Sequence, residues 1–541
     1  MNKPLLLSLA VFVLLGTNMS AASMEERFEA MEKEMQKLKQ EIAALKSQKT
    51  VAKKIENKED ADEELDNEKN VIASKELNKI SPPIVTVLDK EKDDEEDEDE
   101  IASTEDRLFD LEEAVSEINR NTSGSHLKFQ VDYRFAIENM DYKMVDGTKA
   151  KNNAFMTNRL WLDMGYKATN NLSFIGQLAY NKAFGARSGA NNPASASIEA
   201  FDWIANENAY DDTIRVRSAY FLWQDREFMG LDIPWTFSIG RRPSTNGALV
   251  NLRDDDIASS PVGHAINVEF DGLSSQFTLN QKYGTSVKLC LGRGMSNAAP
   301  KFISTPYTDV NNANGGNSNI DLAGFIFTPY SDRQYKVSSM YYYASNLIDA
   351  INPNDYTQGF STVGGMHTGV VYASSKGIGE NLGTFLEDTT IFASFAMSKT
   401  DPKNGQGMLG SAVNESKTGT SFWIGTQFPS LLSNDGKWGL EYNHGSKYWR
   451  SMTYAEDTNI GSKLASRGDA YEAYFTEYLV DDILSMQLRY TYIDYKYSGS
   501  NGFFGNTSGT AMSMDEAIGA GIGGSIVDKA QDIRLYIRYR Y

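Results

Sequence analysis

The feature that most constrains the fold of this chain is an alternation of apolar and polar residues, which begins near residue 126 and recurs to the end. In the last stretch Ile533, Leu535, Ile537, Tyr539 and Tyr541 occupy every second position, and the positions between them are polar or charged. A period of two residues is that of a β-strand, whose successive side chains point to opposite faces. The alternation predicts an all-β fold for residues 126–541.

The alternation predicts about sixteen antiparallel strands, or eighteen if a long gap hides a hairpin. Their ranges are 126–138, 155–167, 172–184, 213–223, 234–242, 265–279, 285–293, 319–328, 334–345, 365–376, 384–398, 418–428, 437–444, 468–479, 483–497 and 531–541. Asp271 and Gly272 could form a hairpin turn. We interpret 265–279 as one strand with a bulge at Gly272, because the alternation then continues.

Two kinds of fold present such strands: a soluble sandwich with apolar faces inside, and a membrane barrel with apolar faces toward lipid. Short and long gaps alternate along the chain, as in outer-membrane barrels with short periplasmic turns and long outer loops. Residues 1–22 combine Lys3, an apolar run and small residues, which is the pattern of a secretory signal peptide. We therefore expect a transmembrane β-barrel in outer-membrane lipid.

A strongly charged segment separates the signal peptide from the barrel. The whole chain has a net charge of −20, and residues 24–125 hold 31 acids against 16 bases. Within that segment residues 50–100 show no apolar period, and 91–100 contain nine acids. Such a block repels itself and stays extended. We predict an acidic disordered spacer at 50–100 in the periplasm.

Heptad repeats flank the spacer and predict two short coiled coils, at 23–49 and 101–120. The apolar seam of the first consists of Phe28, Met31, Met35, Leu38, Ile42 and Leu45. Opposite charges meet at the positions that face each other in a parallel assembly, namely Arg27–Glu32, Glu34–Lys39 and Glu41–Lys46. The pattern favours parallel self-association, but the mixed seam residues do not distinguish two strands from three.

Heptads followed by a sixteen-strand pattern and a terminal tyrosine resemble a trimeric outer-membrane porin with a periplasmic coiled-coil stalk. The segment 240–247, which reads GRRPSTNG, with Leu252 and Arg253 resembles an uncharacterised porin family with such stalks. The final strand, Ile533 to Tyr541, likewise resembles the assembly signal of bacterial outer-membrane barrels. The resemblance implies a homotrimer that lets small hydrophilic solutes or ions diffuse passively.

Two other functions stay open at this point. The stalk could bind peptidoglycan or periplasmic proteins, so that the barrel mainly anchors the outer membrane to the cell wall. The barrel could also be a sleeve around an electron-transfer partner.

The resemblance also directs attention to the third long gap, 243–264, because general porins fold their third outer loop into the pore. This gap contains Arg253, Asp254, Asp255 and Asp256. On neighbouring strands Arg215, Arg217 and Arg242 occupy the polar positions, which would face the lumen. Arginines opposite the aspartates would set up a transverse field across a narrow eyelet. The alternative is an outward, solvated loop with arginines that pair locally.

Several functional classes are disfavoured. An acidic chain is an improbable nucleic-acid binder, since phosphate would repel it. The four histidines are scattered and Cys290 is the single cysteine, so no metal site is expected. We expect neither a cofactor nor catalytic residues.

Overall fold

The computed structural model of the protein describes residues 127–185, 209, 213–295, 298–300, 307–309, 319–352, 358–378, 383–433, 435–453, 456 and 458–541. The predicted signal peptide, both coiled coils with their seam, and the acidic spacer lie outside these residues. In the part of the chain that is described, no helix is long and apolar enough to cross a membrane.

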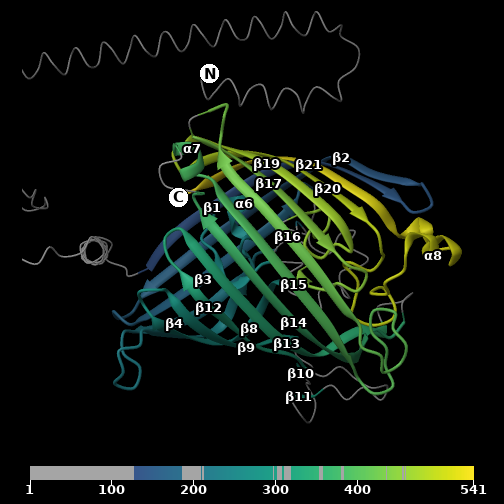
Figure 1. The fold of residues 1–541 in the computed structure, drawn as a ribbon, viewed down its shortest axis with the longest axis horizontal. Helices are drawn as coiled ribbons and strands as arrows, with labels where there is room; N and C mark the ends of the chain where they lie inside the picture. The colour runs from purple at the N-terminus through teal and green to yellow at the C-terminus, as the bar shows by residue number, and fades with distance from the viewer. Residues whose placement is uncertain are drawn as a thin grey trace, which may run out of the picture. The chain divides into compact units, whose positions relative to one another are not determined.

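The described chain forms a closed antiparallel β-barrel of sixteen long strands (Figure 1). These are β1 (Leu127–Met144), β2 (Lys149–Lys167), β3 (Leu172–Ala183), β4 (Arg215–Asp225), β5 (Trp235–Ser244), β8 (Ile266–Asn280), β9 (Thr285–Met295), β12 (Ile320–Ser331), β13 (Tyr335–Ala350), β14 (Phe360–Lys376), β15 (Thr390–Pro402), β16 (Thr418–Pro429), β17 (Gly436–Gly445), β19 (Gly468–Val480), β20 (Leu484–Tyr495) and β21 (Val527–Arg540). The last strand closes the barrel by pairing with the first, with Phe135 opposite Ile537.

The predicted antiparallel barrel of sixteen strands is confirmed, with three local corrections. Residues 384–387 form a short helix, α7 (Thr384–Glu387), and β15 begins at Thr390 instead of 384. The first long gap is absent, because β1 and β2 pair as far as Lys143 and Lys149 around a tight turn. Residues 266–280 do form one strand, but Gly272 is in register with Gly240 and Gly292, so the predicted bulge is wrong there.

The barrel has a turn end and a loop end. Short connections, such as 168–171, 281–284 and 481–483, lie at the turn end, where Tyr541 exchanges two backbone hydrogen bonds with Val131. The loop end carries the long connections 245–265, 446–467 and 496–526, called L3, L7 and L8 below. L8 includes the short helices α8 (Met514–Gly519) and η2 (Gly523–Ser525). The two-stranded pair β10 (Ala298–Pro300) and β11 (Tyr307–Asp309) belongs to the connection between β9 and β12.

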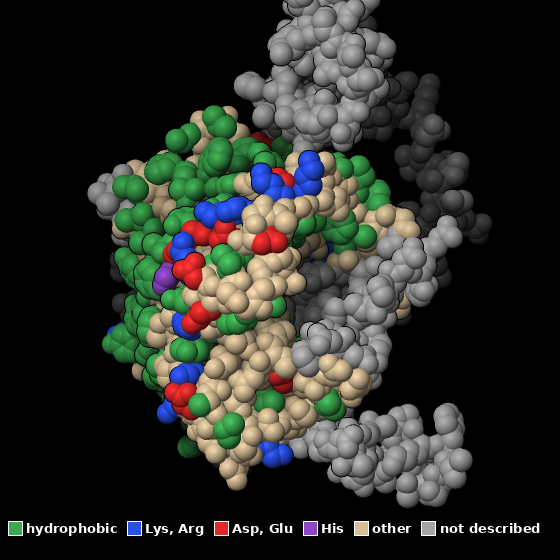
Figure 2. All heavy atoms as spheres, turned by 90° about the vertical axis from the view of Figure 1, so that its right-hand side faces the viewer, with side chains coloured by type: hydrophobic (Ala, Val, Ile, Leu, Met, Phe, Trp, Pro, Cys, Tyr) green, Lys and Arg blue, Asp and Glu red, His purple; other side chains and the backbone are tan. Residues whose placement is uncertain are grey.

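The outer face of the barrel is apolar. Leu289 and Leu291 on β9 are 52% and 53% exposed, and Phe395 and Met397 on β15 are similarly exposed. Figure 2 shows hydrophobic side chains covering a broad part of the described barrel surface. In the C-terminal strand Ile533, Tyr539 and Tyr541 belong to this exposed set, whereas Leu535 is buried and Ile537 is partly buried. A surface of this kind is suited to lipid rather than to water.

The barrel interior is largely filled, because L3 and L7 fold into it. L3 contains β6 (Gly247–Ala248), α6 (Val250–Asp254) and β7 (Ser259–Val262), and L7 contains β18 (Met452–Thr453). The two loops meet where β18 pairs in parallel with the start of β8. Their apolar residues pack against inward-facing side chains of β8 to β16 in one cluster, which includes Leu249, Ala265, Met366, Trp423, Trp449 and Met452. This side of the interior is therefore an apolar core.

Candidate functional site

The tip of L3 crosses the barrel from one wall to the other. Around the barrel β8 is followed by β9, β12, β13, β14, β15, β16, β17 and β19, so β19 is eight strands from β8. Half of sixteen strands is the largest possible separation. Arg253 in α6 nevertheless lies 3.2 Å from Glu472 on β19, measured from Nη1 to Oε1. L3 therefore spans the interior instead of pointing outward.

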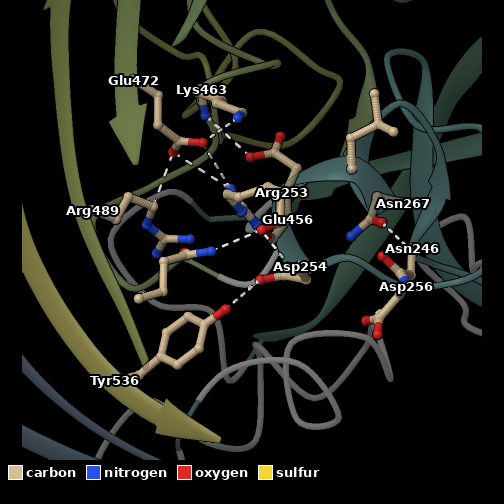
Figure 3. Close-up of polar contacts among 12 residues, drawn as sticks. Asn246, Arg253, Asp254, Asp256, Asn267, Glu456, Lys463, Glu472, Arg489 and Tyr536 are labelled. Carbon is tan, nitrogen blue, oxygen red and sulfur yellow. Dashed lines mark hydrogen bonds and ion pairs between the residues drawn. The ribbon is translucent and has the colours of Figure 1, made fainter. Parts of the chain in front are cut away.

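Arg253 is the centre of a buried ionic cluster that joins L3, L7 and the wall (Figure 3). Besides Glu472, it donates a hydrogen bond to the backbone carbonyl of Glu456 in L7. From L7 the amino group of Lys463 lies 2.5 Å from Glu472 and 2.6 Å from Glu441. Arg489 on β20 lies 3.9 Å from the second oxygen of Glu472. Removal of one partner from such a cluster leaves a buried charge uncompensated, which is strongly destabilising.

The three aspartates of L3 face the wall formed by β17 to β21. Asp254 accepts a hydrogen bond of 3.3 Å from the Tyr536 hydroxyl. Asp255 lies 3.1 Å from Lys437 Nζ and accepts a hydrogen bond from Tyr478. Asp256 lies 2.8 Å from Arg538 and 2.7 Å from Arg540. The acids predicted for the eyelet are therefore inside the barrel and in direct contact with basic and phenolic groups.

Burial acts on the aspartates in different ways. Burial raises the pKa of Asp256, and the attraction of Arg538 only partly offsets it. At Asp255 burial also disfavours the charge, but the hydrogen bond from Tyr478 and the nearby Lys437 outweigh it, so the pKa is lowered. Asp255 is thus the more firmly ionised of the two.

Of the arginines predicted for the opposite wall, Arg217 and Arg242 have described contacts near their own strands. Arg217 is buried, lies 3.4 Å from Glu269 on β8 and donates hydrogen bonds to Gln177 and Thr245. Arg242 lies over the ring of Tyr220, with 4.9 Å between its Cζ and the ring centroid. Arg215, at the start of β4, is partly buried. A role of these three in lining a pore stays a prediction.

The basic wall residues that contact the aspartates of L3 are others, Lys437, Arg538 and Arg540, which the sequence reasoning missed. Arg134 on β1 is in register with Arg159 on β2 and with Arg538 on β21, so the three lie in one row across the wall. Asp132 holds the row together, at 3.0 Å from Arg159 and from the Nε of Arg538. The signal was available, because Arg534, Arg538 and Arg540 occupy the polar positions of the C-terminal strand.

At the height of the ionic cluster, charged side chains of the described wall are almost inaccessible to solvent. Arg489, Arg534 and Glu472 face inward and are only 1%, 2% and 3% exposed. A water-filled channel would leave such side chains accessible. Nearer the turn end inward-facing side chains such as Lys437 are partly exposed. L3 and L7 therefore leave these three wall side chains inaccessible.

The structure is similar to solved outer-membrane proteins at low sequence identity. OmpT of Vibrio cholerae, folded in vitro, gives a TM-score of 0.40 at 13% identity over 77% of this chain and 97% of that one. The anion-selective porin from Comamonas acidovorans gives 0.41 at 9% identity, over 77% and 99%. OprB of Pseudomonas putida, in its high-pH structure, gives 0.42 at 12% identity, over 78% and 96%.

Comparison of the sequence with known families assigns the chain to one of them. No curated protein matches the chain. The profile of a family described as "Protein of unknown function (DUF3373)" matches residues 149–541, which is most of the chain and nearly all of the barrel. The chain therefore belongs to the DUF3373 family.

Proposed function

We propose that the protein is an outer-membrane channel for small hydrophilic solutes or ions, with a passage restricted by L3. The observation that carries this proposal is a closed barrel with an apolar outer face and a charged interior wall, against which the tip of L3 is held by Asp254, Asp255 and Asp256. Apolar groups toward lipid and charged groups toward the lumen are the arrangement of membrane channels of the β-barrel type.

The path that we propose follows the charged wall rather than the apolar core. The row of Arg134, Arg159 and Arg538 lies on this wall, and the aspartates of L3 lie against it. Because the side chains at this height are buried, solutes can pass only when the tip of L3 moves away from the wall. We therefore expect a channel with a closed state that opens through displacement of L3.

We also propose that the protein lies in the outer membrane and that three copies of it form a homotrimer. The apolar outer face supports the first, and the heptads of the sequence support the second. The alternatives of a cell-wall tether and of a sleeve for an electron carrier depend on the stalk or on another protein, and no contact of the described residues favours them.

Planar-bilayer recording of the purified full chain tests the proposal. We expect stepwise conductance with closures. We expect the double variant Asp255→Asn/Asp256→Asn to raise the open probability, since it weakens the contacts of the L3 tip with the wall and leaves Arg253 in the ionic cluster. A folded protein that gives no conductance steps, either as wild type or with these substitutions, would refute a channel function. Heat-denatured protein is the control for leakage.

A further inference from the structure

A second feature of the interior is a cavity between L3 and one wall of the barrel. This wall lies across the interior from the ionic cluster. The volume of the cavity is about 90 Å³. The wall side comes from β5, β8, β9, β12 and β13, each of which pairs with the next, and the L3 side comes from Ser260 and Pro261 of β7. Most of the lining is apolar, with Phe270, Leu322, Ile326 and Met340 among it.

Two basic side chains reach this apolar cavity. Lys288 on β9 is only 9% exposed, and its amino group donates a hydrogen bond to the hydroxyl of Ser260. Arg242 on β5 is partly buried, and its Nη1 is buried without a hydrogen-bond partner among the described residues. Both cations therefore line the same cavity and keep donor capacity there.

No carboxylate compensates these cations within the cavity. Its lining residues, all of them described, include neither Asp nor Glu. The ionisable neighbours that act on Lys288 are Arg242 and the Cys290 thiol, and those that act on Arg242 are Tyr220 and the same thiol. The two cations thus repel each other beside groups that are neutral at pH 7. Burial of charge without a counter-charge is costly, and a bound anion would remove that cost.

We propose that this cavity binds a small organic monocarboxylate, whose carboxylate contacts Arg242 and Lys288 and whose apolar body packs on Phe270, Leu322 and Met340. A guanidinium offers a planar pair of donors that matches a carboxylate. The apolar remainder of the lining suits a hydrocarbon group rather than a second charge or a hydration shell. This inference goes beyond the proposed channel, because binding at the cavity does not require conduction.

The size of the cavity limits the ligand. A single water needs roughly 10–15 Å³ on this measure, so about 90 Å³ admits a short-chain or single-ring acid. Benzoate and butyrate are suitable probes. Neither forms micelles, and both can therefore be titrated into protein held in a nonionic detergent.

Isothermal titration of benzoate into the folded full-length protein tests the inference. We expect saturable binding of benzoate and no binding of benzyl alcohol, which has the same ring without the charge. In Arg242→Gln and in Lys288→Met the dissociation constant should rise at least tenfold. Lys336→Gln on β13 is the matched control, since Lys336 does not line the cavity, and its affinity should equal that of the wild type.

Three results would overturn the inference: no saturable benzoate binding to the wild type, equal binding of benzyl alcohol, or unchanged affinity in both cavity variants. If a variant does not fold, as judged by its heat-modifiable migration in gels, Arg242→Lys and Lys288→Arg replace it and should retain binding. The comparison of benzoate with benzyl alcohol on the wild type decides the question even without variants.

Conductance recorded from the same preparation separates this inference from the proposed function. A protein that conducts but does not bind benzoate refutes only the carboxylate site. A protein that binds benzoate but never conducts refutes only the channel.

Discussion

Arg538 of the C-terminal strand and Asp256 of L3 form an ion pair in which Nη2 and Oδ1 are 2.8 Å apart. The two residues are 282 positions apart in the sequence. Arg538 also contacts Asp132 on β1, the strand with which β21 closes the barrel. The same side chain thus contacts both the strand pair that closes the barrel and the tip of L3.

Weakening of the ion pair between Arg538 and Asp256 should open the channel. We predict that Asp256→Asn raises the open probability in planar bilayers, because the tip of L3 loses its charge attraction to Arg538 and Arg540. A loss of about 1.4 kcal/mol in holding energy corresponds to about a tenfold change in the population of the displaced loop. Arg293→Gln breaks a half-exposed pair with Asp321 on the outer face and is the control. Identical openings in Asp256→Asn and the wild type would contradict a role of L3 in closure.

The buried ionic cluster should be essential for stability. We predict that Lys463→Met destabilises the barrel by roughly 3–5 kcal/mol, because Glu441 and Glu472 then lose their shared buried partner. Urea unfolding in detergent, followed by heat-modifiable migration, measures the change.

Lys417→Met is the comparison for that experiment. Lys417 pairs with the exposed Glu415 outside the barrel interior, where solvent screens the charges. Its unfolding midpoint should stay close to that of the wild type. Similar losses in both variants would show that the cluster has no special importance.

The barrel could be predicted from sequence because its signal is local. In β9, for example, Leu289 and Leu291 alternate with Lys288 and Cys290, and that pattern alone determines a strand and its two faces. Gly272 shows the limit of such reasoning. Its place in register with Gly240 and Gly292 depends on the neighbouring strands, which no local pattern reveals.

The candidate site could be predicted only in part. The aspartates of L3 were identified from their place in the third long gap, but their partners were not. Tyr536, which contacts Asp254, is 282 positions away, and Arg538 is equally far from Asp256. Around a closed barrel the first and last strands become neighbours, so sequence proximity favoured Arg215, Arg217 and Arg242 instead.

Acid should weaken the attachment of L3 through His264. This buried residue lies 2.8 Å from the Ser394 hydroxyl through Nδ1 and 2.9 Å from the Ser421 hydroxyl through Nε2. Burial lowers its pKa to about 3, whereas an unfolded histidine titrates near 6.5. Below pH 6.5 the unfolded chain binds a proton that the folded chain does not, so stability falls as the pH falls toward 3.

His264→Gln should lose that dependence. Between pH 6.5 and 4.5 we expect the wild type to lose roughly 2–3 kcal/mol more unfolding free energy than the variant. Carboxylates titrate in both proteins, so the difference between their urea midpoints isolates the histidine. His367→Gln changes a partly exposed ring outside the interior and is the comparison variant. Equal slopes in the wild type and His264→Gln would contradict the assignment.

Gly272 in the wall should tolerate no side chain. A Cβ on Gly272 would lie 2.2 Å from the carbonyl oxygen of Leu291 and 2.7 Å from the Cα of Gly292, and both are backbone atoms that cannot move alone. We predict that Gly272→Ala lowers the fraction of folded barrel, with a cost of at least about 1–3 kcal/mol from overpacking. At Gly369 on β14 a Cβ would meet nothing within 4 Å. Gly369→Ala should therefore fold like the wild type in the same heat-modifiability assay, and an equal loss in the two variants would show that close packing at Gly272 is not the cause.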